Sequence, residues 1–198
     1  MSASTKFPPP DVPYIRAKYQ GDKQNPTLIV MHSTVSTASA GAAYAIAMMW
    51  NRNTSPQSSA HYVVDAAKTY QCVYDSVVAW HCGYNTGSIG VEMCDNPSEP
   101  SNRWEKKDHI AMFNRTVDLV AQLCLSKGIR ARFLTDDQLR AWGRNKTLAN
   151  GGITTHAQMS RVFKKSTHWD PGVWPSQKFL LAVNAKIKSK TEKATEQK

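Results

Sequence analysis

The chain has 198 residues, of which 41% are hydrophobic, and a formal net charge of +10. This length suits one domain with a sizeable core, and the absence of an uncharged apolar run of about 18 residues excludes a membrane-spanning helix. The positive charge favours a polyanionic partner such as nucleic acid, anionic lipid or bacterial wall polymer, with solubility alone as the alternative.

The two ends of the chain differ in composition from the region between them. Residues 1–25 are polar and proline-rich, which predicts an extended arm lying over the domain. They lack the apolar stretch that a secretory signal needs, so we expect synthesis in the cytoplasm without a signal peptide. Residues 189–198 have low complexity and predict a disordered basic tail. A single domain is therefore expected over residues 26–188.

Hydrophobic periodicity divides this domain into short strands and longer helices. The segments with strand character are 27–31, 61–64, 70–74, 77–80, 88–93, 132–134 and 153–156. The segments with helical spacing are 38–50, 108–127, 135–144 and 178–188. Ser36, Thr37 or Ser39 would cap the first helix, and Gly128 would end the second. The mixture predicts a single α/β domain, with helices on both faces of a central mixed sheet.

The four cysteines do not form a recognisable metal or disulfide framework. Cys72, Cys82, Cys94 and Cys124 contain no C-x-x-C pair, which disfavours a zinc ribbon. Reduced, buried thiols are expected, although Cys72 and Cys82 flank one predicted turn and would be able to pair if oxidised.

Three residues far apart in the sequence are candidate metal ligands. His32 follows the apolar run 27–31, His156 follows the extended segment that begins at residue 153, and Asp170 precedes the turn-forming pair Pro171-Gly172. Taken singly, each has a structural explanation. Together they form the set of two imidazoles and one carboxylate with which a catalytic zinc keeps its fourth position open for water. There is no H-E-x-x-H motif, so zincin-type proteases are excluded.

Six short motifs, in order between residues 27 and 175, carry a resemblance to a known family. They are IVMHST at 29–34, SAHYVVD at 59–65, VAWHCG at 78–83, SIGVEM at 88–93, TH at 155–156 and DPG at 170–172. With these motifs the chain resembles the zinc-dependent N-acetylmuramoyl-L-alanine amidases of the peptidoglycan-recognition-protein family, which includes many phage endolysins. The resemblance implies that family's α/β fold.

The resemblance also implies a metal site and a reaction. One zinc ion per chain would be bound by His32, His156 and Asp170, and the activated water would attack the amide between N-acetylmuramic acid and L-alanine in peptidoglycan. Glu92 matches the acidic position that some members use as the catalytic base, and a carboxylate beside such a water can take its proton. A structural glutamate at a strand end is the alternative.

Two positions depart from the family pattern. Many members have a lysine two residues before the third ligand, where this chain has His168, whose imidazole can also donate a hydrogen bond or a proton. Members often have a tyrosine where this chain has Ala60, so that any tyrosine role is absent or moved to Tyr62. We therefore predict catalytic roles for Glu92 and His168.

The region around residues 80–85 resembles the family's substrate groove. His81, Tyr84 and Asn85, together with His61, are candidate substrate-binding residues, because sugars stack on aromatic rings and hydrogen-bond to polar side chains. Trp80 is expected in the core, and His109, at a helix start, on the surface.

The predicted partner is bacterial peptidoglycan, and we expect a monomer. A non-catalytic peptidoglycan receptor and a basic nucleic-acid-binding module are the alternatives. Receptors of this family usually lack the ligand set, and no nucleic-acid-binding signature appears in the sequence, so specific nucleic-acid binding is not expected. Wall-cutting chemistry without a secretion signal fits a phage endolysin that reaches the wall through a holin pore.

Overall fold

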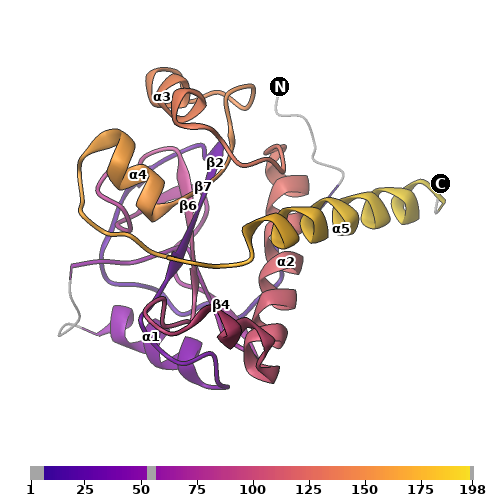
Figure 1. Ribbon diagram of the computed structural model, residues 1–198. Coiled ribbons are helices and arrows are strands. Elements are labelled where there is room, and N and C mark those ends of the chain that lie inside the picture. The colour runs from indigo at the N-terminus through magenta and orange to yellow at the C-terminus, as the bar shows by residue number, and fades with distance from the viewer. Residues whose placement is uncertain (1–6, 53–56, 197–198) are drawn as a thin grey trace.

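The computed structural model describes residues 7–52 and 57–196 and contains a five-stranded sheet with helices on both of its faces (Figure 1). The strand order is β4 (Thr69–Gln71), β3 (Tyr62–Val64), β6 (Ser88–Met93), β2 (Leu28–Ser33) and β7 (Gly152–Thr155). Only the β3–β4 pair is antiparallel. The predicted mixed sheet is therefore confirmed. A separate ribbon pairs β1 (Gln20–Lys23) with β5 (Val77–Ala79).

The helices form two groups that follow from the alternation of side chains along the central strands. Residues Leu28 and Val30 of β2 share a buried cluster with α3 (Asp136–Arg144) and α4 (His156–Phe163). Ile29 and Met31 point the other way, into the larger cluster that contains α2 (Lys107–Lys127) and α5 (Ser176–Glu196). Helix α1 (Ala42–Asn51) packs against β3 and β4, and a 3₁₀ helix, Ser101–Glu105, precedes α2.

The carboxyl ends of three parallel strands meet at one edge of the sheet. His32 pairs in register with Glu92 of β6, and Met31 pairs with Thr155 of β7, the residue before His156. Residues at even positions of β2 and β6 share one face, so His32 and Glu92 lie side by side there. Ligands of open α/β sheets bind outside the carboxyl ends of the strands, which makes this edge the place to look for a site.

Helix α1 starts later than its sequence predicts and is capped by a residue from another part of the chain. Its first residue is Ala42, and no side chain of the predicted caps at residues 36, 37 or 39 hydrogen-bonds to the helix end. Instead, the carboxylate of Asp65 accepts hydrogen bonds from the backbone N–H groups of Gly41 (2.9 Å) and Ala43 (3.0 Å). This long-range cap replaces the local one that the sequence predicts.

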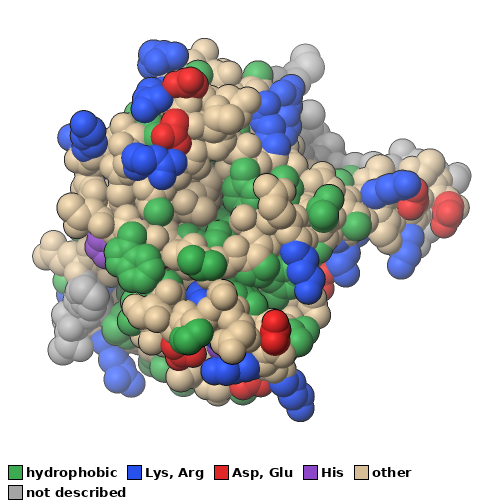
Figure 2. Space-filling view, viewed as in Figure 1, with side chains coloured by type: hydrophobic (Ala, Val, Ile, Leu, Met, Phe, Trp, Pro, Cys, Tyr) green, Lys and Arg blue, Asp and Glu red, His purple; other side chains and the backbone are tan. Residues whose placement is uncertain are grey.

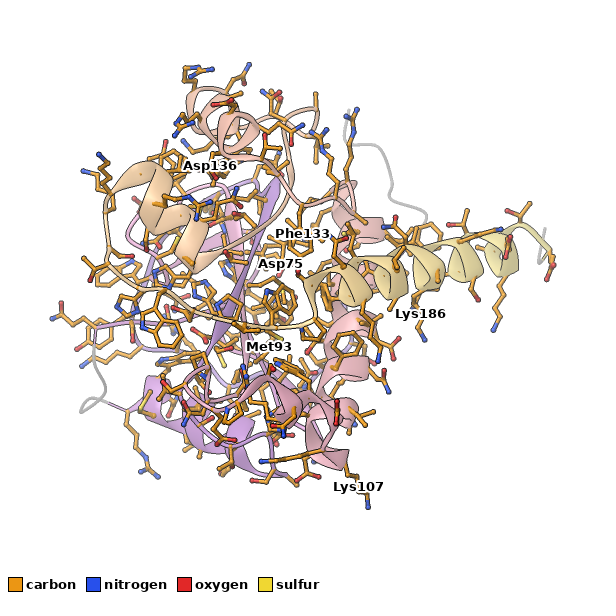
Figure 3. The ribbon with its side chains drawn as sticks, viewed as in Figure 1. Asp75, Met93, Lys107, Phe133, Asp136 and Lys186 are labelled. Carbon is orange, nitrogen blue, oxygen red and sulfur yellow. The ribbon has the colours of Figure 1, made fainter. Side chains whose placement is uncertain are left out.

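Two further segments differ from prediction in the described part of the chain. Residues 132–134 form only an isolated bridge at Phe133, not a strand, and α4 is a helix in a segment for which no element was predicted. Helix α5 continues to Glu196, so residues 189–196 are helical where a disordered tail was predicted. Lys186 pairs with Asp118 of α2 at 2.6 Å (Figure 3), and Lys190 donates to Gln122 at 2.8 Å. These contacts hold α5 along α2.

The described part of the predicted N-terminal arm lies against the domain. The backbone N–H groups of Ile15 and Ala17 donate to the carbonyls of Gln71 and Cys72, and the arm then continues into β1. Residues 1–6 lie outside the described residues. Within residues 7–52 and 57–196, no helix is long and apolar enough to cross a membrane.

All four cysteines are buried and unpaired, as expected for reduced thiols. Burial raises the pKa of each thiol to about 12, which keeps the thiols protonated and unreactive near neutral pH.

Candidate metal centre

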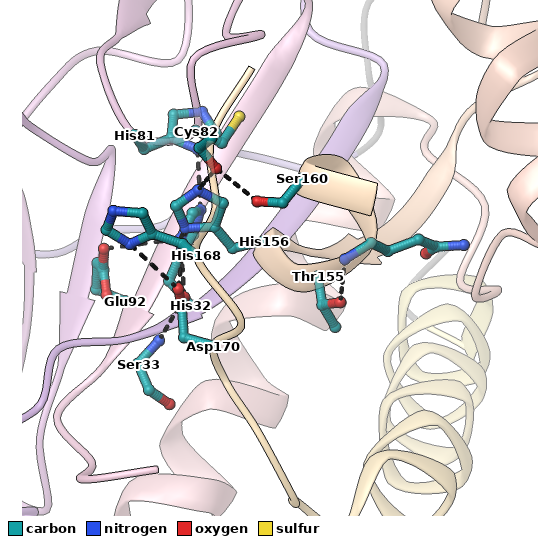
Figure 4. A network of polar contacts seen from close by, with 12 residues as sticks. His32, Ser33, His81, Cys82, Glu92, Thr155, His156, Ser160, His168 and Asp170 are labelled. Atoms are coloured by element: carbon teal, nitrogen blue, oxygen red, sulfur yellow. Dashed lines mark hydrogen bonds and ion pairs between the residues drawn. The ribbon is translucent and has the colours of Figure 1, made fainter. Parts of the chain in front are cut away.

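His32, His156 and Asp170 converge at the carboxyl edge of the sheet, although 124 residues separate the two histidines. His32 is on β2, His156 opens α4, and Asp170 lies in the loop that leads to α5 (Figure 4). His32 Nδ1 is 3.1 Å from His156 Nδ1 and 3.3 Å from Asp170 Oδ2, and His156 Nδ1 is 3.0 Å from Asp170 Oδ1. We call these three buried residues the metal centre.

The atoms that face one another in the metal centre suit a divalent cation. One candidate ligand atom from each of the three residues lies within 4.8 Å of the other two. Burial lowers the pKa of His32, which favours the neutral imidazole that a metal needs. Burial by itself would raise the pKa of Asp170, but the hydrogen bond from His156 and the other polar contacts of the carboxylate hold it below its ordinary value, so the carboxylate is ionised. Two imidazoles and one carboxylate match a catalytic zinc site.

Two backbone features hold Asp170 in place. The Ser33 backbone N–H donates to Asp170 Oδ2 at 3.3 Å, and the Ala157 N–H donates to the Asp170 carbonyl at 2.9 Å. The Asp170–Pro171 peptide is cis, and Gly172 has φ of 63°, so the turn predicted at 170–172 is present. A Cβ at Gly172 would lie 2.8 Å from the Trp169 ring, which leaves room only for glycine.

A buried ion pair between Asp95 and Arg103 was not predicted from the sequence. Asp95 accepts two hydrogen bonds from Arg103, at 2.7 and 2.9 Å, and a third from the Ser33 hydroxyl at 3.4 Å. Arg103 also donates to the carbonyl of Val173 at 3.0 Å, so the pair links β2 to the loop after Asp170. His109 contacts Asp95 at 3.1 Å and is 7% exposed, so the prediction of a surface position for it was wrong.

Glu92 lies beside the metal centre with one oxygen that has no partner. Its Oε1 is 3.9 Å from His32 Nδ1, and its Oε2 is buried without a hydrogen-bond partner among the described residues. Burial, and then the charge of Asp170, raise the pKa of Glu92 well above its ordinary value. A carboxylate in these surroundings has a strong tendency to take up a proton.

His168 lies on the outer side of the metal centre. Its ring stacks on that of His156, with centroids 4.7 Å apart, and its Nδ1 is 3.7 Å from Asp170 Oδ1. The side chain is 67% exposed, in contrast to the buried ligands. Its imidazole is therefore accessible to a molecule bound next to the metal centre.

A cavity of about 490 Å³ opens over the metal centre. Its lining includes the three candidate ligands with Glu92 and His168, and also Met49, Trp80 and Trp169. Trp80 is 37% exposed and Trp169 56% exposed, so the prediction of a core position for Trp80 was wrong. No place in the cavity was predicted for Trp169, although its position between His168 and Asp170 in the sequence indicates one.

Of the four predicted substrate-binding residues, only His81 lines the cavity over the metal centre, and all four make contacts within the protein. His61 is fully buried outside the cavity lining: its Nδ1 accepts from the Gly90 N–H at 3.0 Å, and its Nε2 is 2.9 Å from the Val77 carbonyl. Burial lowers its pKa to about 4, so it is neutral. This placement contradicts a substrate contact for His61.

The other three predicted substrate residues also have partners within the protein. The ring of Tyr84 stacks on Phe163 with centroids 4.2 Å apart, and its hydroxyl donates to the Gly143 carbonyl. The Asn85 side chain accepts hydrogen bonds from the backbone N–H groups of residues 81 and 82. His81 lines the cavity, but both of its ring nitrogens are within hydrogen-bond distance of other side chains. These contacts do not fit a direct role in substrate binding.

The positive charge does not form one patch on the face drawn in Figure 2. Lysine and arginine side chains appear there near α3 and α4, along α5 and at the opposite edge, separated by uncharged surface. Arg161 and Asp136 form an ion pair at the surface, and the hydrogen bond from Arg161 lowers the pKa of Asp136 to about 2. This face therefore lacks the continuous basic stripe that is typical of nucleic-acid-binding domains.

Comparison with protein families supports the assignment made from the motifs. The model of the N-acetylmuramoyl-L-alanine amidase family matches residues 22–173. The N-acetylmuramoyl-L-alanine amidase XlyA of Bacillus subtilis (strain 168) is 33% identical over an alignment of 81 residues, which covers 38% of this chain and 27% of that protein. The matched stretch thus spans about a quarter of that relative's length.

Solved structures share the fold at low sequence identity. The chain matches a mutant endolysin from Bacillus subtilis with a TM-score of 0.59 and 19% identity, covering 87% of this chain and 98% of that one. The catalytic domain of XlyA matches with a TM-score of 0.59 and 18% identity, covering 88% and 99%. The hydrolase AmiA of Staphylococcus aureus, solved with its ligand, matches with a TM-score of 0.67 and 17% identity, covering 94% and 88%.

Proposed function

Because this chain belongs to the N-acetylmuramoyl-L-alanine amidase family, we propose that it hydrolyses the amide between N-acetylmuramic acid and L-alanine in bacterial peptidoglycan, with a zinc ion bound by the metal centre. The observation that carries the proposal is the convergence of His32, His156 and Asp170 next to Glu92, inside a cavity. A receptor that binds without cutting needs no such set of ligands, so the arrangement favours an enzyme.

The proposed hydrolysis gives separate roles to the three candidate ligands, to Glu92 and to His168. His32, His156 and Asp170 would hold zinc, which lowers the pKa of water and polarises a carbonyl group when it is bound. Glu92 takes the proton of the attacking water, because its buried oxygen has no other partner and its pKa is raised. His168 donates a hydrogen bond to the oxygen on which negative charge develops, since its ring is exposed beside Asp170.

The cavity walls are suited to a glycan that carries a peptide. Trp80 and Trp169 offer exposed aromatic surface in one continuous lining with the metal centre. Aromatic rings pack against the apolar faces of sugars, and the polar groups between them can bond to amides. We therefore assign substrate binding to these tryptophans in place of His61, His81, Tyr84 and Asn85.

Digestion of purified peptidoglycan with the purified protein tests the proposed bond. We expect mass spectrometry of the products to show stem peptides with a free L-alanine amino terminus and glycan chains whose lactyl groups carry no peptide. Cleavage within the peptide, or between the sugars, would assign a different reaction to the metal centre. Protein that binds the wall tightly and yields no new termini would favour the receptor alternative.

We also propose that the protein is made in the cytoplasm of a bacterial host and cuts the wall after release, in phage-driven lysis. The chemistry proposed above and the fold shared with a chain described as an endolysin support this setting. Bacteria that express the protein should remain intact until the membrane is permeabilised by a holin or by chloroform, and should then lyse. Lysis at the same rate without permeabilisation would contradict the proposal.

A further inference from the structure

A chain of hydrogen bonds runs from His32 of the metal centre through His81 and Ser88 to the backbone of Asn85. His81 Nδ1 is 2.9 Å from His32 Nε2, and His81 Nε2 is 3.1 Å from the Ser88 hydroxyl. The Ser88 hydroxyl is in turn 2.6 Å from the carbonyl oxygen of Asn85. We call this chain of four residues the His81 relay. His32, His81 and Ser88 are all buried, so water has little access to these bonds.

The direction of every bond in the His81 relay is set by its last member. A carbonyl oxygen can only accept, so the single hydroxyl proton of Ser88 is donated to Asn85. The Ser88 oxygen must therefore accept from His81 Nε2–H, which leaves a lone pair on His81 Nδ1. That lone pair accepts from His32 Nε2–H, and the lone pair of His32 is consequently on Nδ1. Nδ1 is the atom that faces His156 and Asp170.

The sheet is shaped to hold the His81 ring in this position. Gly90 of β6 lies directly under it, and a Cβ at Gly90 would be 2.7 Å from the ring carbon Cγ. The side-chain oxygen of Asn85 also accepts from the backbone N–H of His81 at 3.1 Å, which fixes the turn that carries the ring. Gly90 and Asn85 therefore restrain the imidazole of His81, so its contact with His32 does not depend on a mobile side chain.

We propose that His81 is a positioning residue that holds His32 in the tautomer with the lone pair on Nδ1, directed at the metal centre, and that Ser88 sets the direction of the relay. The inference rests on the proposed metal centre, but it concerns a property of the metal-free protein. His81 itself is not a ligand, because its Nδ1 is occupied by His32. Groups that orient a ligating histidine in this way contribute strongly to metal affinity.

The tautomer is tested directly in the metal-free wild-type chain. Nitrogen-15 NMR of the histidine side chains distinguishes protonated from unprotonated ring nitrogens. We expect His32 to be protonated at Nε2 and unprotonated at Nδ1, and His81 to have the same pattern. Protonation of His32 at Nδ1 would overturn the proposal, whether or not the protein binds zinc or cuts peptidoglycan. A chain that shows the expected tautomer but binds no zinc would instead contradict the proposed function alone.

Zinc affinity measured by competition with a chromogenic chelator tests the role of His81. Replacement of His81 with phenylalanine removes the acceptor and should weaken zinc binding by about 10- to 100-fold. His81→Asn places an amide oxygen close to the position of Nδ1 and should restore most of the affinity. If His81→Phe does not fold, His81→Asn is compared with Ser88→Ala, which should weaken zinc binding while the asparagine variant does not.

His61→Asn is the matched control, because His61 is equally buried and its ring lies 5.9 Å from that of His81 without contacting a ligand. Thermal unfolding of the metal-free forms shows how far each substitution disturbs the fold. We expect His61→Asn to lower the melting temperature and leave zinc affinity unchanged. Equal losses of affinity in the His61 and His81 variants, or wild-type affinity in His81→Phe, would reduce His81 to a packing role and overturn the proposal.

Discussion

Removal of the metal should abolish the release of stem peptide from bacterial wall, and added zinc should restore it. The three candidate ligands approach one another from β2, from α4 and from the loop before α5. A divalent cation bound by them would polarise the substrate amide. A metal ion stabilises the charge of such a transition state by several kcal/mol, and each 1.36 kcal/mol is a factor of ten in rate. We therefore expect the rate to fall by about three orders of magnitude or more.

Asp170→Asn should have nearly the same effect as chelation. The amide has the shape of the carboxylate but not its charge, and a neutral group between two imidazoles binds a divalent cation poorly. Zinc content and peptide release should be measured on the same preparations. Asp137→Asn is the matched control, since the Asp137 side chain is 94% exposed and distant from the metal centre, and it should keep both properties. Full activity of a preparation shown to be free of metal would contradict the proposed mechanism.

Glu92→Gln should eliminate most of the turnover while zinc remains bound. Glutamine fits the same space beside His32 but has no carboxylate to take a proton, and general base catalysis is typically worth about 10²- to 10⁴-fold in rate. We expect a loss of that size in the turnover number, with zinc content equal to that of the wild type. Glu99→Gln, at an exposed glutamate paired with Lys106, serves as the control and should retain its rate. An unchanged rate in Glu92→Gln would remove Glu92 from the mechanism.

The same substitution should not destabilise the metal-free protein at neutral pH. The pKa of Glu92 is raised in the folded state, so the ionised side chain opposes folding at pH values above its ordinary pKa of 4.5. The penalty is absent well below that pH and grows as the pH rises toward the raised pKa. Melting temperatures of metal-free Glu92→Gln should therefore match those of the wild type in acid and equal or exceed them at pH 7. A variant that is less stable at pH 7 but not in acid would show that the carboxylate stabilises the fold.

The sequence predicted most accurately the elements whose signals are local. The strand 88–93 has the bounds that were predicted for it, and α2 ends at Lys127, before Gly128, which adopts the left-handed conformation with φ of 70°. Helix α3 begins at a capping box formed by Thr135 and Gln138, three residues apart in the sequence. For the two helix ends the deciding contacts lie within one turn, so the residues that form the end also specify it.

The errors fall where distant parts of the chain supply the deciding contact. Helix α1 is capped by Asp65, more than twenty residues away, and α5, which extends to Glu196, bonds to α2 through Lys186 and Lys190. His61, a predicted substrate contact, is fully buried, and Trp80, a predicted core residue, is 37% exposed. Composition does not reveal which side of a strand or turn another element will cover.

The sequence by itself determined which residues are the candidate ligands, since two histidines and an aspartate stand at motif positions. Only the tertiary structure brought them within 4.8 Å of one another, because the parallel register of β2, β6 and β7 aligns strand ends that are far apart in the chain. The tertiary structure also places His81 between His32 and Ser88. Whether a buried imidazole binds substrate or orients another imidazole depends on what its two nitrogens face, and that is decided by packing across the sheet and not by local sequence.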